Sequence, residues 1–440
     1  MTRRNAQAVR PAGPHAPVVS DDELEMIQRR CMAYFLHRQH PATGLFPDST
    51  ELNKPANITT CGFGLTCLGV AAERGWITHA EGLSRSLRLV RTLCGLEQSR
   101  FARASGYRGF FYRFLDMQTG RRAYRCELST LDTAYLAAGL LAAAAYFDDD
   151  ELHACVQQLI SRVQWAWMLS GDKLLRHGWK PAGGFLPYRY ERLDEAVLLY
   201  VLAAGAEAHA VPPTSWARYA RSFVPSRQLG VAYVHFGSLF VHQYPHAWLD
   251  LNGLQDKHLQ AAGLCLFENS RRATQVQQAY GVANPLQHAG YDAAHWGVSA
   301  GDGPVAAGTS AGGAGGRRGK AGFGYAGRCI LDVTDDGTLS PWAAAASLPF
   351  APELCLPLIR RVLDAGPPPA PHAFAAATNP SAGWQSTVAF GFNEAMLLLA
   401  IENYRGGGVW RRMRGCSQVR RGLAACGFAG GWLGELEAAA

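Results

Sequence analysis

A series of helical segments, about half of them apolar on every side, is the feature that most constrains the fold of this 440-residue chain. Residues 193–208 and 392–405 show the pattern best. Each segment has an acidic residue near its start, followed by an almost unbroken apolar run, VLLYVLA in the first and MLLLAIE in the second. A helix that is apolar all round must be buried, and a carboxylate at its N-terminus is favoured by the helix dipole. We therefore expect an inner layer of helices covered by an outer one.

The remaining periodicity predicts an all-α chain. After a first helix capped by Asp21 or Asp22, helices are expected at 61–74, 79–94, 129–147, 151–169, 193–208, 214–223, 251–263, 268–280, 341–346, 353–364, 392–405 and 408–414. Strand-like runs are few and short, near 109–112 and 230–236. Two concentric layers of paired helices predict an (α/α)6 toroid of six helical hairpins with long loops. A linear array of three-helix domains is the alternative architecture.

The toroid is expected to form a single catalytic domain over residues 21–428, with its C-terminal half starting near residue 230. Residues 1–20 are interpreted as a disordered lead. The stretch 305–324, VAAGTSAGGAGGRRGKAGFG, is interpreted as a flexible Gly-rich insertion, because nothing in it can form a core. Residues 429–440 are expected to be a loosely held tail.

Composition argues against several classes of protein. Apolar residues make up 48% of the chain and charged residues 18%, a globular balance. The net charge of +7 comes mainly from scattered arginines without a basic stripe among aromatics, so no nucleic-acid partner is expected. The longest apolar runs are too short or too rich in alanine for a membrane span. Nothing in the sequence implies an obligate protein partner.

The cysteines and the N-terminus bear on the compartment. The eleven cysteines include no CxxC pair and sit mostly in apolar runs, which predicts buried free thiols rather than a zinc site. The N-terminus is basic but lacks the apolar stretch of a signal peptide, so the sequence as written predicts a cytoplasmic protein.

Two loops combine carboxylates with aromatic or basic residues. In the first, Ser129 can cap the following helix, which makes Asp132 a capping residue as well as a candidate, and leaves Glu127 without a structural duty. The second runs from 179 to 190 and leads to Glu195; it offers Trp179, Tyr188 and Arg189. Aromatic faces suit the apolar faces of sugar rings, and charged groups suit their hydroxyls. We interpret this loop as a glycan subsite, with a packed loop and a surface Glu as the structural alternative.

The other candidates lie in the C-terminal half. His242 and His246 are four residues apart, but Pro245 breaks the helical face that a zinc pair would need, so we expect hydrogen-bonding histidines. The calcium-loop-like stretch 332–337 lacks its final Glu and is expected to be a turn. No metal and no cofactor are predicted. The further candidate substrate-binding residues are His235, Phe236, His242, Trp248, Glu268, Arg271, Trp296, Asp302 and Glu394.

Known catalytic motifs narrow the choice of chemistry. The sequence has no GxSxG, no P-loop and no dinucleotide-binding glycine motif. What remains is carboxylates beside aromatics on a helical scaffold. Glycoside hydrolysis uses two carboxyl groups, one kept protonated as the acid and one ionised to activate water.

Many short motifs, in order along residues 22–428, resemble the glucoamylase-like family. In the N-terminal half these are TCGFGLT (60–66), AAERGW (71–76), GFFYRFLD (109–116) and ELSTLDT (127–133). In the C-terminal half they are VHFGS (234–238), ENSR (268–271), DGP (302–304), DDGT (335–338), SLPFAPE (347–353) and IENYR (401–405). Such proteins are similar to the endo-β-1,2-glucanases of glycoside hydrolase family 144 and to the transglycosylating domain of cyclic β-1,2-glucan synthases.

The resemblance implies an (α/α)6 toroid with a glycan cleft and inverting hydrolysis of a β-glucan, most specifically β-1,2-glucan, without a cofactor. It implies that Glu195 is the general acid and that Glu127 and Asp132 line the subsite of the scissile sugar, one of them handling the water. Members of the family usually carry an export signal, which implies a periplasmic or secreted location.

The chain departs from the family pattern near its last inner helix. Asn393, Glu394 and Ala395 stand where Asp-Gln-Gly is expected. Asn cannot act as a base, so a base there is lost unless Glu394 replaces it. The loop after 302–304 is replaced by the Gly-rich insertion. We therefore keep two alternatives: transglycosylation of the same glucan, and a non-catalytic glycan-binding or scaffold role. An enzyme acting on isoprenoid substrates is disfavoured, because the sequence has no DDxxD motif.

Overall fold

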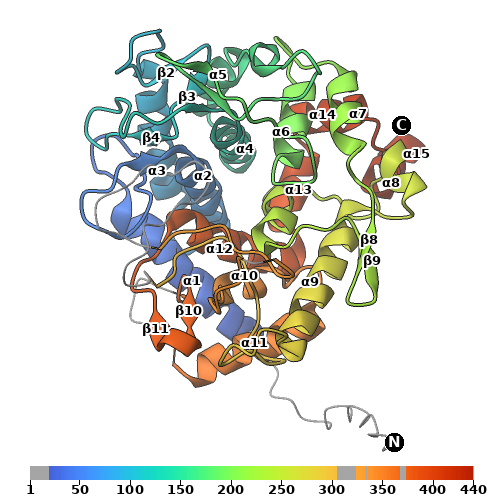
Figure 1. The fold of residues 1–440 in the computed structure, drawn as a ribbon. Helices are drawn as coiled ribbons and strands as arrows, with labels where there is room; N and C mark the ends of the chain where they lie inside the picture. The colour runs from blue at the N-terminus through green and yellow to red at the C-terminus, as the bar shows by residue number, and fades with distance from the viewer. Residues whose placement is uncertain (1–18, 305–323, 333, 367–372, 440) are drawn as a thin grey trace, which may run out of the picture.

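The computed structural model describes residues 19–304, 324–332, 334–366 and 373–439 (Figure 1). The expected disordered lead and the Gly-rich insertion lie almost entirely outside these residues. One large cluster of buried apolar side chains includes residues from Val19 to Trp432. The core is thus built from both ends of the chain, and two smaller clusters flank it.

The inner layer is a ring of nearly fully buried helices. Neighbours along the ring pack on one another, including α2 against α4, α4 against α6, and α12 against both α10 and α2. The inner helices of the described residues are α2 (Ile58–Glu73), α4 (Thr130–Tyr146), α6 (Val197–Ala204), η3 (Tyr244–Ala247), α10 (Pro341–Ala346) and α12 (Gly391–Gly406).

An outer layer covers this ring with helices that are apolar on one face only. Its members are α1 (Asp21–Arg38), α3 (His79–Gly95), α5 (Asp150–Ser161), α7 (Pro213–Ala220), α9 (Leu266–Ala283) and α11 (Pro352–Asp364). Most outer helices pack on an inner helix; α3 lies on α2, α5 on α4, and α1 on α12 (Figure 1). The fold is the (α/α)6 toroid that the two kinds of helix predicted.

Short elements fill the loops at the two ends of the ring. The helices are η1 (Trp165–Met168), η2 (Leu239–His242), α8 (Lys257–Ala261), η4 (Pro380–Ala382), α13 (Gly408–Arg414), α14 (Ser417–Ala425) and α15 (Gly431–Ala439). All strand pairs of the described residues are antiparallel. Three strands form one sheet in the order β5 (Leu128–Ser129), β6 (Gly178–Lys180) and β7 (Gly184–Phe185). The other strands form two-stranded sheets: β1 (Ala56–Asn57) with β4 (Phe114–Leu115), β2 (Gly106–Tyr107) with β3 (Phe110–Phe111), β8 (Ser226–Gln228) with β9 (Val231–Tyr233), and β10 (Thr378–Asn379) with β11 (Trp384–Gln385). The expected strand runs thus contain β3 and β9.

Most helix boundaries agree with the sequence to within a few residues, and the differences have local causes. Ser20, not Asp21 or Asp22, caps α1: its Oγ accepts the Glu23 N–H at 3.2 Å, and the Glu23 carboxylate accepts the Ser20 N–H at 2.9 Å. The helix expected over 251–263 shortens to α8, because Asp256 caps it late. The one expected over 151–169 ends at Ser161 and is followed by η1.

The C-terminal tail is more ordered than expected. Residues after 428 form α15, and the Trp432 side chain is buried. The Trp432 indole Nε1–H donates to the Asp250 carbonyl at 2.9 Å. The prediction of a loosely held tail therefore needs correction for this helix, since a single large aromatic anchors it to the core.

The tightest contact in the ring is between α2 and α4. A Cβ atom on Gly139 would lie only 1.9 Å from the carbonyl oxygen of Gly62. Only glycine at this crossing lets the two backbones come so close. The close approach brings the N-terminal ends of these two helices together.

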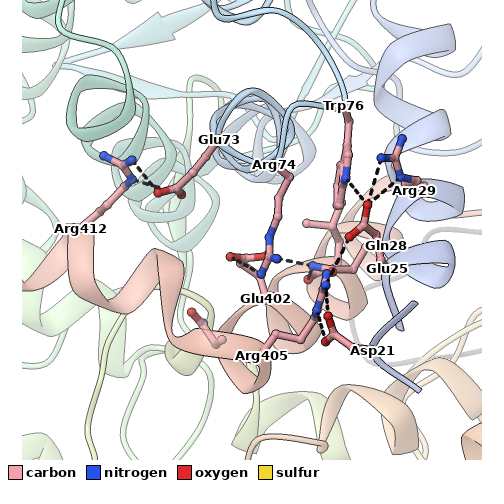
Figure 2. A network of polar contacts seen from close by, with 12 residues as sticks. Asp21, Glu25, Gln28, Arg29, Glu73, Arg74, Trp76, Glu402, Arg405 and Arg412 are labelled. Carbon is pink, nitrogen blue, oxygen red and sulfur yellow. Dashed lines mark hydrogen bonds and ion pairs between the residues drawn. The ribbon is translucent and has the colours of Figure 1, made fainter. Parts of the chain in front are cut away.

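A network of ion pairs closes the ring at the opposite end from these N-termini (Figure 2). Glu402, near the end of α12, accepts from Arg74 Nε at 2.9 Å and from Gln28 Nε2 at 3.1 Å. Arg405, one turn later, donates to Asp21 Oδ1 at 2.6 Å and to Gln28 Oε1 at 2.7 Å. The first helix is thereby joined to the last inner helix and to the end of α2.

Candidate active site

A hollow of about 570 Å³ lies at the N-terminal ends of the inner helices. This volume is within the range of about 300–1,000 Å³ typical of ligand sites. Its walls come from the starts of α2, α4 and α12, from the turn before α6, and from the loops around them. The lining residues are Asp48, Glu51, Lys54, Asn57, Thr59, Arg113, Phe114, Leu131, Asp132, Tyr135, Glu195, Phe240, Tyr244, Ala300, Tyr325, Phe390 and Phe392.

Asp132 is fixed in this hollow by two donors. It is the third residue of α4, and its N–H donates to Ser129 Oγ at 3.2 Å, as the capping pattern predicted. Its carboxylate oxygens accept from Thr59 Oγ1 at 2.5 Å and from Arg113 Nε at 3.0 Å. A carboxylate can accept about four hydrogen bonds. Both oxygens of Asp132 therefore keep acceptor capacity for a substrate or a water molecule.

Arg113 joins the two carboxylates of the first candidate loop. It lies 3.2 Å from Glu127 Oε1 as well as 3.0 Å from Asp132 Oδ2. The two negative charges raise the pKa of Arg113 further above its ordinary value, with Asp132 the larger cause. Glu127 is also 4.0 Å from Lys180 Nζ, and it borders the hollow only through Arg113.

Glu195 faces the same hollow from the turn before α6. The sequence placed it on the helix, but α6 begins two residues later, at Val197. Burial raises the pKa of the Glu195 carboxyl, and the negative charge of Asp132 raises it further, while its own backbone N–H and Arg113 act in the opposite direction. A carboxyl of raised pKa and a carboxylate in an ion pair thus share a single cavity.

The turn that carries Glu195 is itself held by buried hydrogen bonds. Asp194 Oδ1 accepts from the Tyr219 hydroxyl and from the Ala196 N–H, both at 2.9 Å. The Tyr135 hydroxyl donates to the Glu195 carbonyl at 3.1 Å. Burial, and then the neighbouring Glu195, raise the pKa of Asp194 well above its ordinary value. These contacts hold the backbone of the turn that carries Glu195.

Aromatic rings form much of the remaining wall, and sequence reasoning missed them. Phe390 lies 5.7 Å from Phe392 and 5.7 Å from Tyr325, between ring centroids. Phe240 and Tyr244 lie on η2 and η3, with their rings 5.4 Å apart. The segment containing Arg113 and Phe114 was noted only as a family motif. Tertiary packing alone brings these residues to the carboxyl groups.

The predicted residues of the 179–190 loop do not line the hollow. Trp179 is mostly buried in β6, where its ring packs against Tyr107 and Trp167 at 5.6 Å. Tyr188 is exposed, and Arg189 pairs with Asp172 at 3.2 Å. The loop leads to Glu195 as expected, but its own aromatics lie outside the lining of the hollow.

Buried aromatic and histidine side chains account for another group of corrections. Trp248 is fully buried, donates to Thr66 Oγ1 at 2.9 Å and stacks on Tyr135. Trp296 is likewise buried in the core. His242 bonds the Phe236 carbonyl at 3.1 Å, and burial lowers its pKa to about 4. His242 thus makes hydrogen bonds, in line with our interpretation. These residues, with His235 and Phe236, lie outside the lining of the hollow.

The remaining candidates are engaged elsewhere. Glu268 pairs with Arg272 at 2.8 Å, and Arg271 lies 3.5 Å from Glu353. Asp302 is buried and accepts from Ser386 Oγ at 2.6 Å. None of these side chains lines the hollow. Among the described residues, no group of three His, Cys, Asp or Glu side chains is placed to hold a metal ion, and no helix is long and apolar enough to cross a membrane.

Glu394 does not replace the Asp expected before it. Its side chain is buried beside the Cys31 thiol and the Ala373 N–H, both of which donate to it, and it lies outside the lining of the hollow. Burial raises the pKa of Glu394 from 4.5 to about 8. It is a buried carboxyl of the core.

We expect Glu394→Gln to change how stability depends on pH. Since the unfolded side chain ionises near pH 4.5 and the folded one near 8, the wild type loses unfolding free energy as pH rises between these values. The variant lacks this loss, so its unfolding free energy relative to that of the wild type should increase from pH 5 to pH 8. Urea unfolding of both proteins at several pH values measures this difference. A difference that does not change with pH would contradict the assignment.

Comparison with known proteins identifies the family. The Glycoamylase family model, described as "Putative glucoamylase", matches residues 187–417, more than half of the chain. The chain therefore belongs to this family.

One curated protein is similar to this chain over most of its length. An exo β-1,2-glucooligosaccharide sophorohydrolase (non-reducing end) from Parabacteroides distasonis is 23% identical over 448 residues; the match covers 92% of this chain and 58% of that protein. The chain thus spans little more than half of that curated relative's length.

Solved structures share the fold. A structure from Bacteroides caccae titled a "putative glucoamylase" is 26% identical, with a TM-score of 0.82, over 94% of this chain and 100% of that one. The endo-β-1,2-glucanase from Chitinophaga pinensis, solved with sophorotriose and glucose, is 22% identical, with a TM-score of 0.79, over 93% of this chain and 98% of that one.

Proposed function

We propose that the chain is a glycoside hydrolase that cleaves β-1,2-glucan. The observation that carries this is the meeting of Glu195, a carboxyl of raised pKa, with the ion-paired carboxylate Asp132 in one aromatic-lined hollow. This is the pairing that hydrolysis of a glycosidic bond requires. The choice of β-1,2-glucan is supported by the names of the Parabacteroides and Chitinophaga relatives.

In this proposal the two carboxyl groups act in sequence on an inverting path. Glu195 donates its proton to the glycosidic oxygen, and the leaving sugar departs as an alcohol. Asp132 accepts a proton from a water molecule that attacks the anomeric carbon from the opposite face. We assign the water to Asp132 rather than Glu127, because only Asp132 lines the hollow.

The surroundings support each of these roles. The burial of Glu195 favours its neutral form, which is the form that can act as an acid. Arg113 holds Asp132 and Glu127 in place through ion pairs of 3.0 and 3.2 Å. The rings of Tyr244, Phe390 and Phe392 offer flat apolar faces on which a sugar ring can stack.

The test is a product assay with anomer detection. Purified protein is incubated with linear β-1,2-glucan and with a panel of other α- and β-glucans, and the new reducing ends are followed by NMR. We expect shorter glucans from the β-1,2-linked substrate, with the α-anomer appearing first. A β-anomer would contradict inversion, and cyclic or longer products would indicate transfer. Binding without any product would support the non-catalytic alternative.

A further inference from the structure

A second hollow, of about 640 Å³, lies beside the first. Its walls include His37 at the end of α1, His40 in the loop that follows, and the turn that begins at Asp116. Glu51 and Lys54 line both hollows. The two cavities therefore meet at this pair, and a molecule in the first can extend into the second.

The boundary between the hollows is a well-anchored ridge formed by residues 48–55. The Asp48 N–H donates to the Pro55 carbonyl, and the Thr50 N–H to the Ala389 carbonyl, both at 2.9 Å. On the ridge, Lys54 Nζ lies 2.6 Å from Glu51 Oε2. Charged groups at a junction of this kind are suited to the hydroxyl groups of a passing sugar chain.

An aromatic pair continues the wall of the first hollow into the second. Phe114 lines the first and Tyr124 lines the second, and their rings meet edge to face at 5.6 Å. The Tyr124 side chain is 63% exposed, so its ring is open to a ligand. Its backbone has a φ of +57°, a conformation that costs energy for a residue with a side chain. The chain thus holds an exposed aromatic ring in an unusual conformation at the wall of a polar hollow.

We propose that the second hollow is an additional binding site for the same glucan chain, with Tyr124 as the ring on which a sugar unit stacks. The identity of the sugar rests on the proposed function. The substrate is then an extended chain that crosses the Glu51–Lys54 ridge away from the carboxyl pair, rather than a disaccharide that fills the first hollow alone.

The test measures binding as a function of chain length, separately from turnover. Glu195→Gln protein is titrated calorimetrically with β-1,2-linked glucose oligomers of increasing length, from the disaccharide upward. We expect affinity to increase with length beyond what the first hollow can hold. In the same background, Tyr124→Ala should weaken binding of the long oligomers about tenfold, the size of a lost aromatic contact, and leave disaccharide binding unchanged.

Phe101→Ala is the matched control, because Phe101 is an exposed ring that lines neither hollow. Its variant should bind every oligomer as the parent does. Equal weakening by both variants, or a Tyr124→Ala variant that keeps the parent's gain in affinity with length, would overturn the proposal. If affinity rises with oligomer length through Tyr124 but the wild type does not hydrolyse the glucan, only the proposed function is wrong. If the wild type hydrolyses the glucan but Tyr124→Ala does not weaken the binding of long oligomers, only the second binding site is wrong.

Discussion

Glu195→Gln is expected to lower kcat on β-1,2-glucan by about 10²–10⁴-fold, the usual contribution of a general acid. The amide keeps the size and shape of the side chain but has no acidic proton to transfer to the leaving oxygen. Initial rates of reducing-end release, measured at saturating glucan, give the change directly. Thermal unfolding of the variant should be similar to that of the wild type or slightly improved, because the substitution removes a buried acid.

Glu191→Gln is the matched control, because Glu191 lies four residues earlier on the same loop, is exposed, and lies outside the lining of the hollow. It should retain wild-type rates. If Glu195→Gln behaves as Glu191→Gln does, Glu195 is not the acid, and the assignment of the hollow as the catalytic site fails with it.

Glu402→Ala is expected to be the most damaging of the stability variants, at about 3–5 kcal/mol of unfolding free energy. The Glu402 side chain is almost fully buried, and its removal leaves Arg74 without this ion pair and Gln28 Nε2 with only the Leu398 carbonyl as acceptor (Figure 2). Breaking an ion pair whose acid is buried costs more than losing a surface pair. Equilibrium urea unfolding followed by circular dichroism measures the loss.

The comparison variant is Glu151→Ala, which removes an equally direct ion pair at the surface. Glu151 lies 2.5 Å from Arg91, but both side chains are about half exposed. Solvent screens such pairs, so we expect no measurable change in the unfolding midpoint. Similar midpoints for the two variants would show that the network in Figure 2 contributes no more than an ordinary surface contact.

The fold could be predicted from sequence because the amino-acid composition of each helical segment shows whether it is buried on every side or on one side only. Segments such as α4 and α12 are apolar on every side, and only an enclosed ring gives them partners on every side. Their alternation with one-sided helices then implies two layers. Boundaries were less predictable where a single side chain decides them, as Asp256 does for α8.

The candidate site was only half predictable. Asp132 and Glu195, which both line the hollow, were named as candidates because each precedes or opens an apolar helix, although the sequence favoured Glu127 over Asp132. Arg113 and Tyr244 were missed because Arg113 lies in the bend between β3 and β4 and Tyr244 lies on the short η3, and the direction of such segments is set by tertiary packing. Trp248 was predicted to bind substrate but is fully buried. The sequence does not distinguish an aromatic side chain that contacts a ligand from one that packs in the core.

The joining of α1 to α12 has a consequence for how the chain is made. The partners of Gln28 in this contact, Leu398 and Glu402, lie 370 and 374 positions further along the sequence. During translation the part of α1 that packs on α12 lacks this partner until almost the whole polypeptide has emerged from the ribosome. Such distant pairings fold slowly and leave sticky surfaces open to aggregation. Successful production of this protein should therefore depend on slow synthesis or chaperone protection of its early helices.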